Sequence, residues 1–165
     1  LLTQGMTIYG VGSDDAHHFA QWNPGKSNPG RGWVMVRAKE LTSDAITDAM
    51  TQATARAVDE LGIGTILCVS GSGFTVRSMA RFRPAAHIVG LSADERTVRQ
   101  LTLSWGTEPI HLPEQGHLDD RVSAALEVAR NRGAVQAGEL VGVLAGTDSK
   151  SRSTNALRIE RVPEA

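Results

Sequence analysis

Two loops of this chain carry residues whose types and spacing are suited to binding a phosphate group. The first is the turn 70–75, which reads SGSGFT, and the second is the segment 146–153, which reads GTDSKSRS. Small hydroxyls and the free backbone N–H groups at the start of a helix can surround an anion. The second loop adds the cations Lys150 and Arg152, which can form charge-assisted hydrogen bonds with phosphate oxygens. The residue types therefore predict a site for a phosphate monoester.

Each loop also has an interpretation that involves no ligand. A tight turn between a strand and a helix uses glycine for its backbone angles, whether or not anything binds there. Lys150 and Arg152 can equally belong to a solvated surface loop. Both interpretations stay open on the residues alone.

A carboxylate and an imidazole two residues apart, Asp15 and His17, form a separate candidate site. They follow residues 6–12, which read as a short strand, so both side chains can point to one face and bind a divalent metal ion. We expect the chain to need no cofactor, and a divalent metal at Asp15 and His17 is the alternative.

The elements around the first loop place it at the edge of a buried sheet. Residues 65–69 (TILCV) form a short apolar run, which is typical of a buried strand in a parallel sheet. Apolar residues at helical spacing predict a helix over 75–83, and Pro84 ends it. In an open α/β sheet, ligands bind outside the carboxyl ends of the strands, where both loops are expected to lie.

Helical and strand-like segments alternate along the rest of the chain. We therefore predict a three-layer α/β/α domain whose sheet has about five strands, mostly parallel, with one antiparallel edge strand. The junction near 39–43 divides an N-terminal segment, 1–43, from the α/β domain, 44–165. The predicted helices cover 44–61, 94–106 and 118–132, and the predicted strands cover 87–91, 108–112, 140–145 and 154–162, with a further strand-like stretch at 34–38.

The composition bounds the classes of protein to which the chain can belong. Its 165 residues are 41% hydrophobic, which suffices for one ordinary globular domain. The net charge of -1 gives no basic field for a nucleic-acid partner. No apolar run approaches the ~20 residues that span a bilayer, so we expect a soluble, cytoplasmic protein without a membrane partner. The single Cys68 is expected to be a small buried hydrophobic residue.

The turn 70–75 is followed by ARFRP at 80–84. This pair resembles the C-terminal domain of pyruvate kinase, a family with a T-x-S-G-x-[ST] turn and a helix that ends in A-R-[YF]-R-P. The resemblance covers about residues 44–162. Its further motifs lie at 120–122 (DRV), 132–133 (RG), 138–141 (GELV), Gly146 and 153–155 (STN).

The resemblance implies a regulatory domain of a glycolytic enzyme, with a phosphorylated small-molecule effector as its partner and with subunit contacts that make a homo-oligomer. The catalytic sites of that family lie in a barrel that this segment does not include, so we expect no phosphoryl transfer by the isolated chain. By the same resemblance the effector would be held by Ser70, Gly71, Ser72, Gly73, Phe74 and Thr75, and covered by Lys150, Ser151, Arg152 and Ser153.

Residues 6–41 resemble a second family, the metal-dependent phosphoesterases of the polymerase and histidinol phosphatase (PHP) superfamily. The resemblance rests on Asp14-Asp15-Ala16-His17 and on the stretch 28–38, which reads NPGRGWVMVRA. It implies that Asp15 and His17 are metal ligands. The chain has no H-x-H motif, which that family uses early in its site.

Three hypotheses for function follow from the sequence. The first is a non-catalytic regulatory domain of pyruvate kinase type that binds a phosphorylated metabolite. The second is a fragment of a metal-dependent phosphoesterase that uses Asp15 and His17. The third is a structural module for subunit assembly.

Overall fold

The structure is a computed structural model that describes residues 9–12, 33–36, 38–114, 116–146 and 154–164. In the two shortest ranges it describes the backbone alone.

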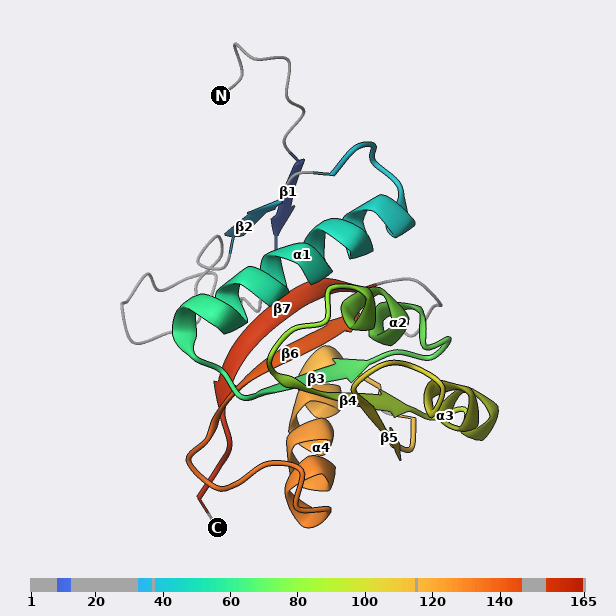
Figure 1. Cartoon of the computed structure of the whole chain (residues 1–165), viewed down its shortest axis with the longest axis vertical. Helices are drawn as coiled ribbons and strands as arrows, with labels where there is room; N and C mark the ends of the chain where they lie inside the picture. Colours follow the sequence, from blue (N-terminus) through green and yellow to red (C-terminus); the bar gives the residue numbers. More distant parts are fainter. Residues whose placement is uncertain (1–8, 13–32, 37, 115, 147–153, 165) are drawn as a thin grey trace.

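A five-stranded sheet forms the centre of the molecule, with the strand order β5-β4-β3-β6-β7 (Figure 1). Neighbouring strands are parallel from β5 through β6, and β7 runs antiparallel to β6 at the edge. This arrangement confirms the predicted mostly parallel sheet with one antiparallel edge strand. The strands are β3 (Thr65–Val69), β4 (His87–Ser92), β5 (Thr107–His111), β6 (Leu140–Gly146) and β7 (Thr154–Arg161).

Helices cover both faces of the sheet, which confirms the three-layer prediction (Figure 1). Helices α1, α2 and α3 contribute to the core on one face, and α4 packs on the other. The helices are α1 (Ser43–Leu61), α2 (Phe74–Arg81), α3 (Glu95–Leu101) and α4 (Leu118–Asn131).

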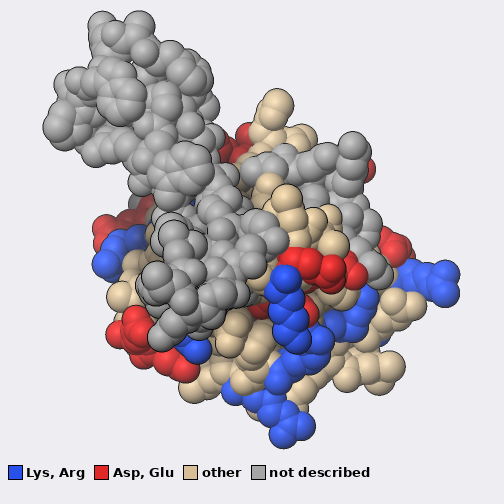
Figure 2. Space-filling model, turned by 90° about the horizontal axis from the view of Figure 1, so that it is seen from above, with Lys and Arg blue, Asp and Glu red and all other residues tan. Residues whose placement is uncertain are grey.

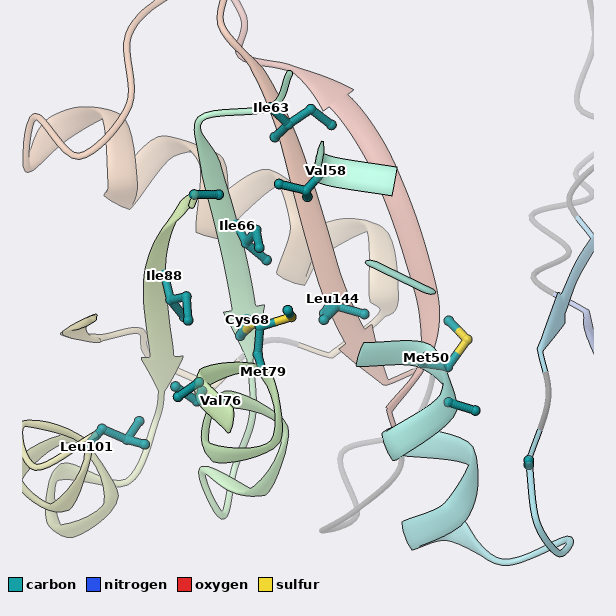
Figure 3. Close-up of a cluster of buried hydrophobic side chains, with 14 residues drawn as sticks. Met50, Val58, Ile63, Ile66, Cys68, Val76, Met79, Ile88, Leu101 and Leu144 are labelled. Carbon is teal, nitrogen blue, oxygen red and sulfur yellow. The ribbon is translucent and has the colours of Figure 1, made fainter. Parts of the chain in front are cut away.

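The central strand β3 is buried on both faces because successive side chains of a strand point to opposite sides. Ile66 and Cys68 belong to the cluster beneath α1 and α2, and Leu67 belongs to the cluster beneath α4. All three are fully buried. Figure 3 shows the first cluster, in which Ile66 and Cys68 meet Val76 and Met79 of α2. The continuous apolar run in the sequence is explained by this two-sided burial.

Local signals in the sequence set the ends of the helices. The Thr42 hydroxyl accepts a hydrogen bond of 3.3 Å from the Ala45 N–H, so Thr42 is the N-cap of α1. Asp94 caps α3 in the same way, accepting from the N–H groups of Arg96 and Thr97. The Thr97 hydroxyl, together with these N–H groups, lowers the pKa of Asp94.

Helix α3 ends earlier than the sequence predicts. We expected it to reach Gly106, yet its last helical residue is Leu101, and Leu103 is 91% exposed. Leu101 is fully buried, and two further turn hydrogen bonds, from the N–H groups of Leu103 and Ser104, follow the helix. Leu103 has the spacing of a residue on the buried face of a longer helix, but its side chain is exposed and does not pack in the core.

The surface carries both signs of charge. Figure 2 shows Lys and Arg side chains next to Asp and Glu side chains over the described part of the face in view. None of the helices in the described ranges is both long enough and apolar enough to cross a bilayer.

Among the strands that the structure describes, the two short ones before the α/β domain pair only with each other. Strand β1 (Tyr9–Gly12) is antiparallel to β2 (Trp33–Val36), and β2 lies against α1, outside the central sheet. A single hairpin is marginally stable on its own. The division of the chain at residue 43 stays a prediction.

Deleting residues 1–36 is expected to lower the free energy of unfolding by less than about 1 kcal/mol, because the hairpin adds no strand to the central sheet. A urea unfolding curve measures the effect. Deletion through residue 41 is the comparison, since it also removes Ala38, which is 6% exposed and packs in the core. Loss of soluble protein on the shorter deletion would contradict the expectation.

Candidate phosphate-binding site

The turn 70–75 follows the carboxyl end of β3 and is anchored to the neighbouring strand. The Ser70 N–H donates to the Leu91 carbonyl at 2.9 Å. The Ser92 hydroxyl, at the end of β4, donates to the Gly71 carbonyl at 3.2 Å and accepts from the Asp94 N–H at the same distance. These bonds hold the turn at the sheet edge where α/β domains bind ligands.

Gly73 allows helix α2 to begin close to side chains of α3. Its φ is 70°, in the left-handed region, and it is the N-cap residue of the helix. A Cβ atom there would lie 3.0 Å from Thr97 Cγ2 and 3.1 Å from Leu101 Cδ2. Glycine is therefore required by both backbone angle and space, and the first N–H groups of α2 begin directly after it.

One hydroxyl of the turn connects it to the second loop. Thr75 Oγ1 lies 2.5 Å from Thr154 Oγ1, and both residues are buried. Thr154 is the first residue of β7 and directly follows the segment 147–153. The residue that follows that segment is therefore held against the turn.

The Ser72 side chain has unused hydrogen-bonding capacity. Its Oγ is buried and has no hydrogen-bond partner among the described residues. Its carbonyl accepts a 2.9 Å hydrogen bond from Arg77 Nη2. A buried hydroxyl without a partner carries a desolvation cost that a ligand oxygen could remove.

The second loop leaves the same edge of the sheet as the turn. Strands β3 and β6 are parallel neighbours, with Cys68 opposite Leu144, so their carboxyl ends lie side by side. Gly146, the last residue of β6, accepts a 2.8 Å hydrogen bond from Arg121 Nη1. Arg121 Nη2 also donates to the Gly116 carbonyl at 3.0 Å. The predicted residues Lys150, Ser151, Arg152 and Ser153 lie outside the described residues.

Ser92 and Arg121 are positioning residues that our sequence interpretation missed. Ser92 directly follows the apolar residues of β4, as Ser70 follows β3. Arg121 sits in the apolar stripe of α4, beside Val122 and one turn before Ala125, and is only 8% exposed. A charged residue within an apolar stripe was the available signal, since such a residue is rarely buried without partners.

Cys68 is confirmed as a buried hydrophobic residue. Burial raises the pKa of its thiol to about 12. A thiol with such a pKa is neutral at physiological pH and unsuited to metal binding or nucleophilic attack.

The candidate metal ligands Asp15 and His17 lie outside the described residues. Within the described ranges, no group of three or more His, Cys, Asp or Glu side chains is close enough together to hold a metal ion.

The chain matches a known family over most of its length. The family described as "Pyruvate kinase, alpha/beta domain" matches residues 48–160. Pyruvate kinase from Lactobacillus delbrueckii subsp. bulgaricus is 32% identical over 128 residues, which are 77% of this chain and 22% of that protein. Pyruvate kinase from Clostridium acetobutylicum is 33% identical over 125 residues, 75% of this chain and 26% of that protein.

The chain spans about a quarter of the length of these relatives. The matched residues include β3, the turn, α2, β6 and all of β7 except its last residue. The resemblance noticed in the ARFRP and SGSGFT motifs is thereby confirmed, and the chain belongs to the pyruvate kinase family, of which it carries the C-terminal α/β domain.

Proposed function

We propose that this chain is a non-catalytic regulatory domain that binds a phosphorylated metabolite at the turn 70–75. The observation that carries the proposal is the contact between Thr75 of the turn and Thr154, the residue that follows the second hydroxyl-rich segment. Lys150 and Arg152 belong to the segment that Thr154 ends. The proposed role of this segment is to cover the ligand and contribute positive charge.

Three features of the turn favour the binding of a phosphate. Helix α2 begins at Phe74, and its first N–H groups carry the positive end of the helix dipole. The Ser72 hydroxyl is buried and without a partner among the described residues. Ser70 and Ser92 fix the backbone of the turn, so little ordering is needed when a ligand binds.

The proposed role is regulatory because the chain matches only one domain of its relatives. Those proteins are named pyruvate kinases, and about three quarters of their length lies outside the match. In this proposal the catalytic groups belong to the rest of such a protein. Binding at the turn would change the activity of those catalytic groups through the regulatory domain as a whole.

A thermal-shift panel of glucose 6-phosphate, ribose 5-phosphate and inorganic phosphate tests the proposal. A ligand at about a hundred times its dissociation constant should add roughly 2.7 kcal/mol to the free energy of unfolding. For a chain of this length that corresponds to a rise of roughly 5–10 °C in the melting temperature. The rise should shrink at high salt, which screens the charges.

Two substitutions locate the site. Ser72→Ala should weaken the shift without destabilising the unliganded protein, because it removes a hydroxyl that lacks a described partner. Lys150→Ala should weaken it by removing a proposed charge. Ser123→Ala, on the exposed side of α4, is the matched control and should respond as the unsubstituted chain does. Absence of any shift with all three compounds, or equal shifts in all variants, would refute the proposal.

A further inference from the structure

An arginine near the start of helix α2 reaches back to the phosphate-binding turn. Arg77 Nη2 donates a 2.9 Å hydrogen bond to the Ser72 carbonyl, and the Arg77 backbone N–H donates to the Gly73 carbonyl at 3.0 Å. Arg77 Nη1 lies 2.9 Å from the position that a Cβ atom on Gly73 would take. The guanidinium group therefore lies directly beside the turn.

The charge of Arg77 is not neutralised by any carboxylate of the described ranges. Among the described residues, its side chain makes no hydrogen bond other than the one to the Ser72 carbonyl. Arg77 is also exposed, so a ligand can reach it. Arg81, one turn later on the same helix, forms an ion pair with Asp48. A guanidinium group has five N–H donors, so Arg77 keeps both donors and charge for a ligand at the turn.

The start of α2 differs in charge from the starts of the other three helices that the structure describes. Those helices carry acidic residues in their first turns, which favourably complement the positive end of the helix dipole. These residues are Asp44 in α1, Glu95 in α3, and Asp119 and Asp120 in α4. Helix α2 has no acidic residue there. Arg77 instead adds positive charge near that end of α2, which is unfavourable unless an anion lies nearby.

We propose that Arg77 makes the turn 70–75 prefer the doubly charged phosphate of a monoester to the singly charged phosphate of a diester. This inference rests on the function proposed for the turn and names the form of phosphate that the turn selects. Hydroxyl and backbone N–H groups can bind either form, because they donate hydrogen bonds without carrying a full charge. A guanidinium group beside them stabilises the second negative charge of a monoester.

The hydrogen bond to Ser72 makes Arg77 effective in this role. It holds the guanidinium group at the turn before any ligand arrives, so little side-chain entropy is lost on binding. The remaining N–H groups of Arg77 belong to a side chain that is already in place. The charge of Arg77 acts in addition to the charges proposed for Lys150 and Arg152, which come from the second loop.

NMR titrations of the full chain with ribose 5-phosphate and with its methyl phosphodiester test the proposal. At about pH 8 the monoester carries two negative charges, because its second pKa is about 6, and the diester carries one. The unsubstituted chain should bind the monoester at least about tenfold more tightly than the diester. Arg77→Met should reduce this ratio at least about threefold. Its melting temperature should change little, because Arg77 is exposed and methionine is a good helix former.

The ratio of the two affinities separates a charge effect from a structural one. If Arg77 only held the turn in shape, Arg77→Met would weaken the binding of both ligands by the same factor. Arg77→Lys keeps the positive charge, so it should retain most of the preference for the monoester. Arg81→Met is the matched control on the same helix. The charge of Arg81 is already paired with Asp48, so its loss should leave the ratio unchanged.

The outcomes also separate this role of Arg77 from the function proposed for the turn. If Arg77→Met keeps the full preference, or if Arg81→Met loses as much of it, the role assigned to Arg77 is wrong. Binding of the monoester to the unsubstituted chain would still support the phosphate site in that case. If the unsubstituted chain binds neither ligand, the phosphate site is refuted, and the role of Arg77 with it.

Discussion

Replacing Gly73 with Ala is expected to lower the free energy of unfolding by about 2–4 kcal/mol. Holding a residue with a Cβ atom in the left-handed conformation costs roughly 1–2 kcal/mol, and the φ of Gly73 is 70°. The new methyl group would also lie 3.0 Å from Thr97 Cγ2 and 3.1 Å from Leu101 Cδ2, so these side chains of α3 must shift to make room. Overpacking of this kind costs about 1–3 kcal/mol.

The same substitution should abolish the thermal shift with sugar phosphates. Gly73 directly follows Ser72 and is the N-cap of α2, so a displaced helix start should misplace both the Ser72 hydroxyl and the first N–H groups of the helix. Urea unfolding gives the stability, and the thermal-shift panel gives the loss of binding.

Gly71 offers a matched control in the same turn. A Cβ atom at Gly71 meets nothing within 4 Å, and its φ lies outside the left-handed region. Gly71→Ala should therefore change the free energy of unfolding by less than about 0.5 kcal/mol. Equal destabilisation by the two substitutions would show that the turn tolerates no side chain anywhere, and the account of Gly73 would be wrong.

The layered fold could be predicted because the periodicity of the sequence matches the burial of each element. The run 65–69 is continuously apolar, and β3 proves to be buried on both faces. The stripe of α4 contains Val122, Leu126 and Ala129, and all three lie in the core beneath that helix. The end of α3 could not be predicted. Leu103 has the right spacing, but nothing in the sequence shows that the helix ends at Leu101 and leaves the Leu103 side chain exposed.

The turn was predictable from local chemistry, whereas the residues that hold it in place were not. Its serines and glycines stand together in the sequence, between a strand and a helix. Ser92 and Arg121 are 22 and 51 residues away from Ser70, and they reach the site only because β4 and α4 pack beside β3. Long-range placement of this kind depends on the sheet order, which single-residue patterns do not specify.

The contact between Arg83 and Trp105 shows the same limitation. The ARFRP motif identified Arg81 and Arg83 as part of a family resemblance, but it assigned them no partner. Trp105 lies 22 residues after Arg83. The two meet because α2 leads into β4 and α3 leads into β5, and these strands are parallel neighbours whose amino ends lie side by side. No local pattern in the sequence indicated this contact.

Arg121→Met is expected to cost about 2–4 kcal/mol of unfolding free energy and to weaken binding at the turn. Methionine can fill much of the space of the arginine stem, yet it donates no hydrogen bond. The Gly146 and Gly116 carbonyls, which now accept from Arg121 at 2.8 and 3.0 Å, would each lose a donor. A buried polar group without a partner costs about 1–3 kcal/mol. Because Gly146 is the residue from which the second loop departs, its displacement should also weaken sugar-phosphate binding.

Arg130→Met on the same helix separates this effect from the general loss of an arginine. Arg130 Nη1 donates to the Pro163 carbonyl at 3.1 Å, which is the same type of bond in an exposed position. Water can replace that donor, so the substitution should cost less than about 0.5 kcal/mol and leave ligand binding unchanged. Arg121→Lys, which keeps the charge and can reach one carbonyl, should fall between the two. If Arg121→Met is as stable as Arg130→Met by urea unfolding, then the buried guanidinium does not hold the end of β6. If it is destabilised but binds sugar phosphates normally, the position of Gly146 does not govern the site.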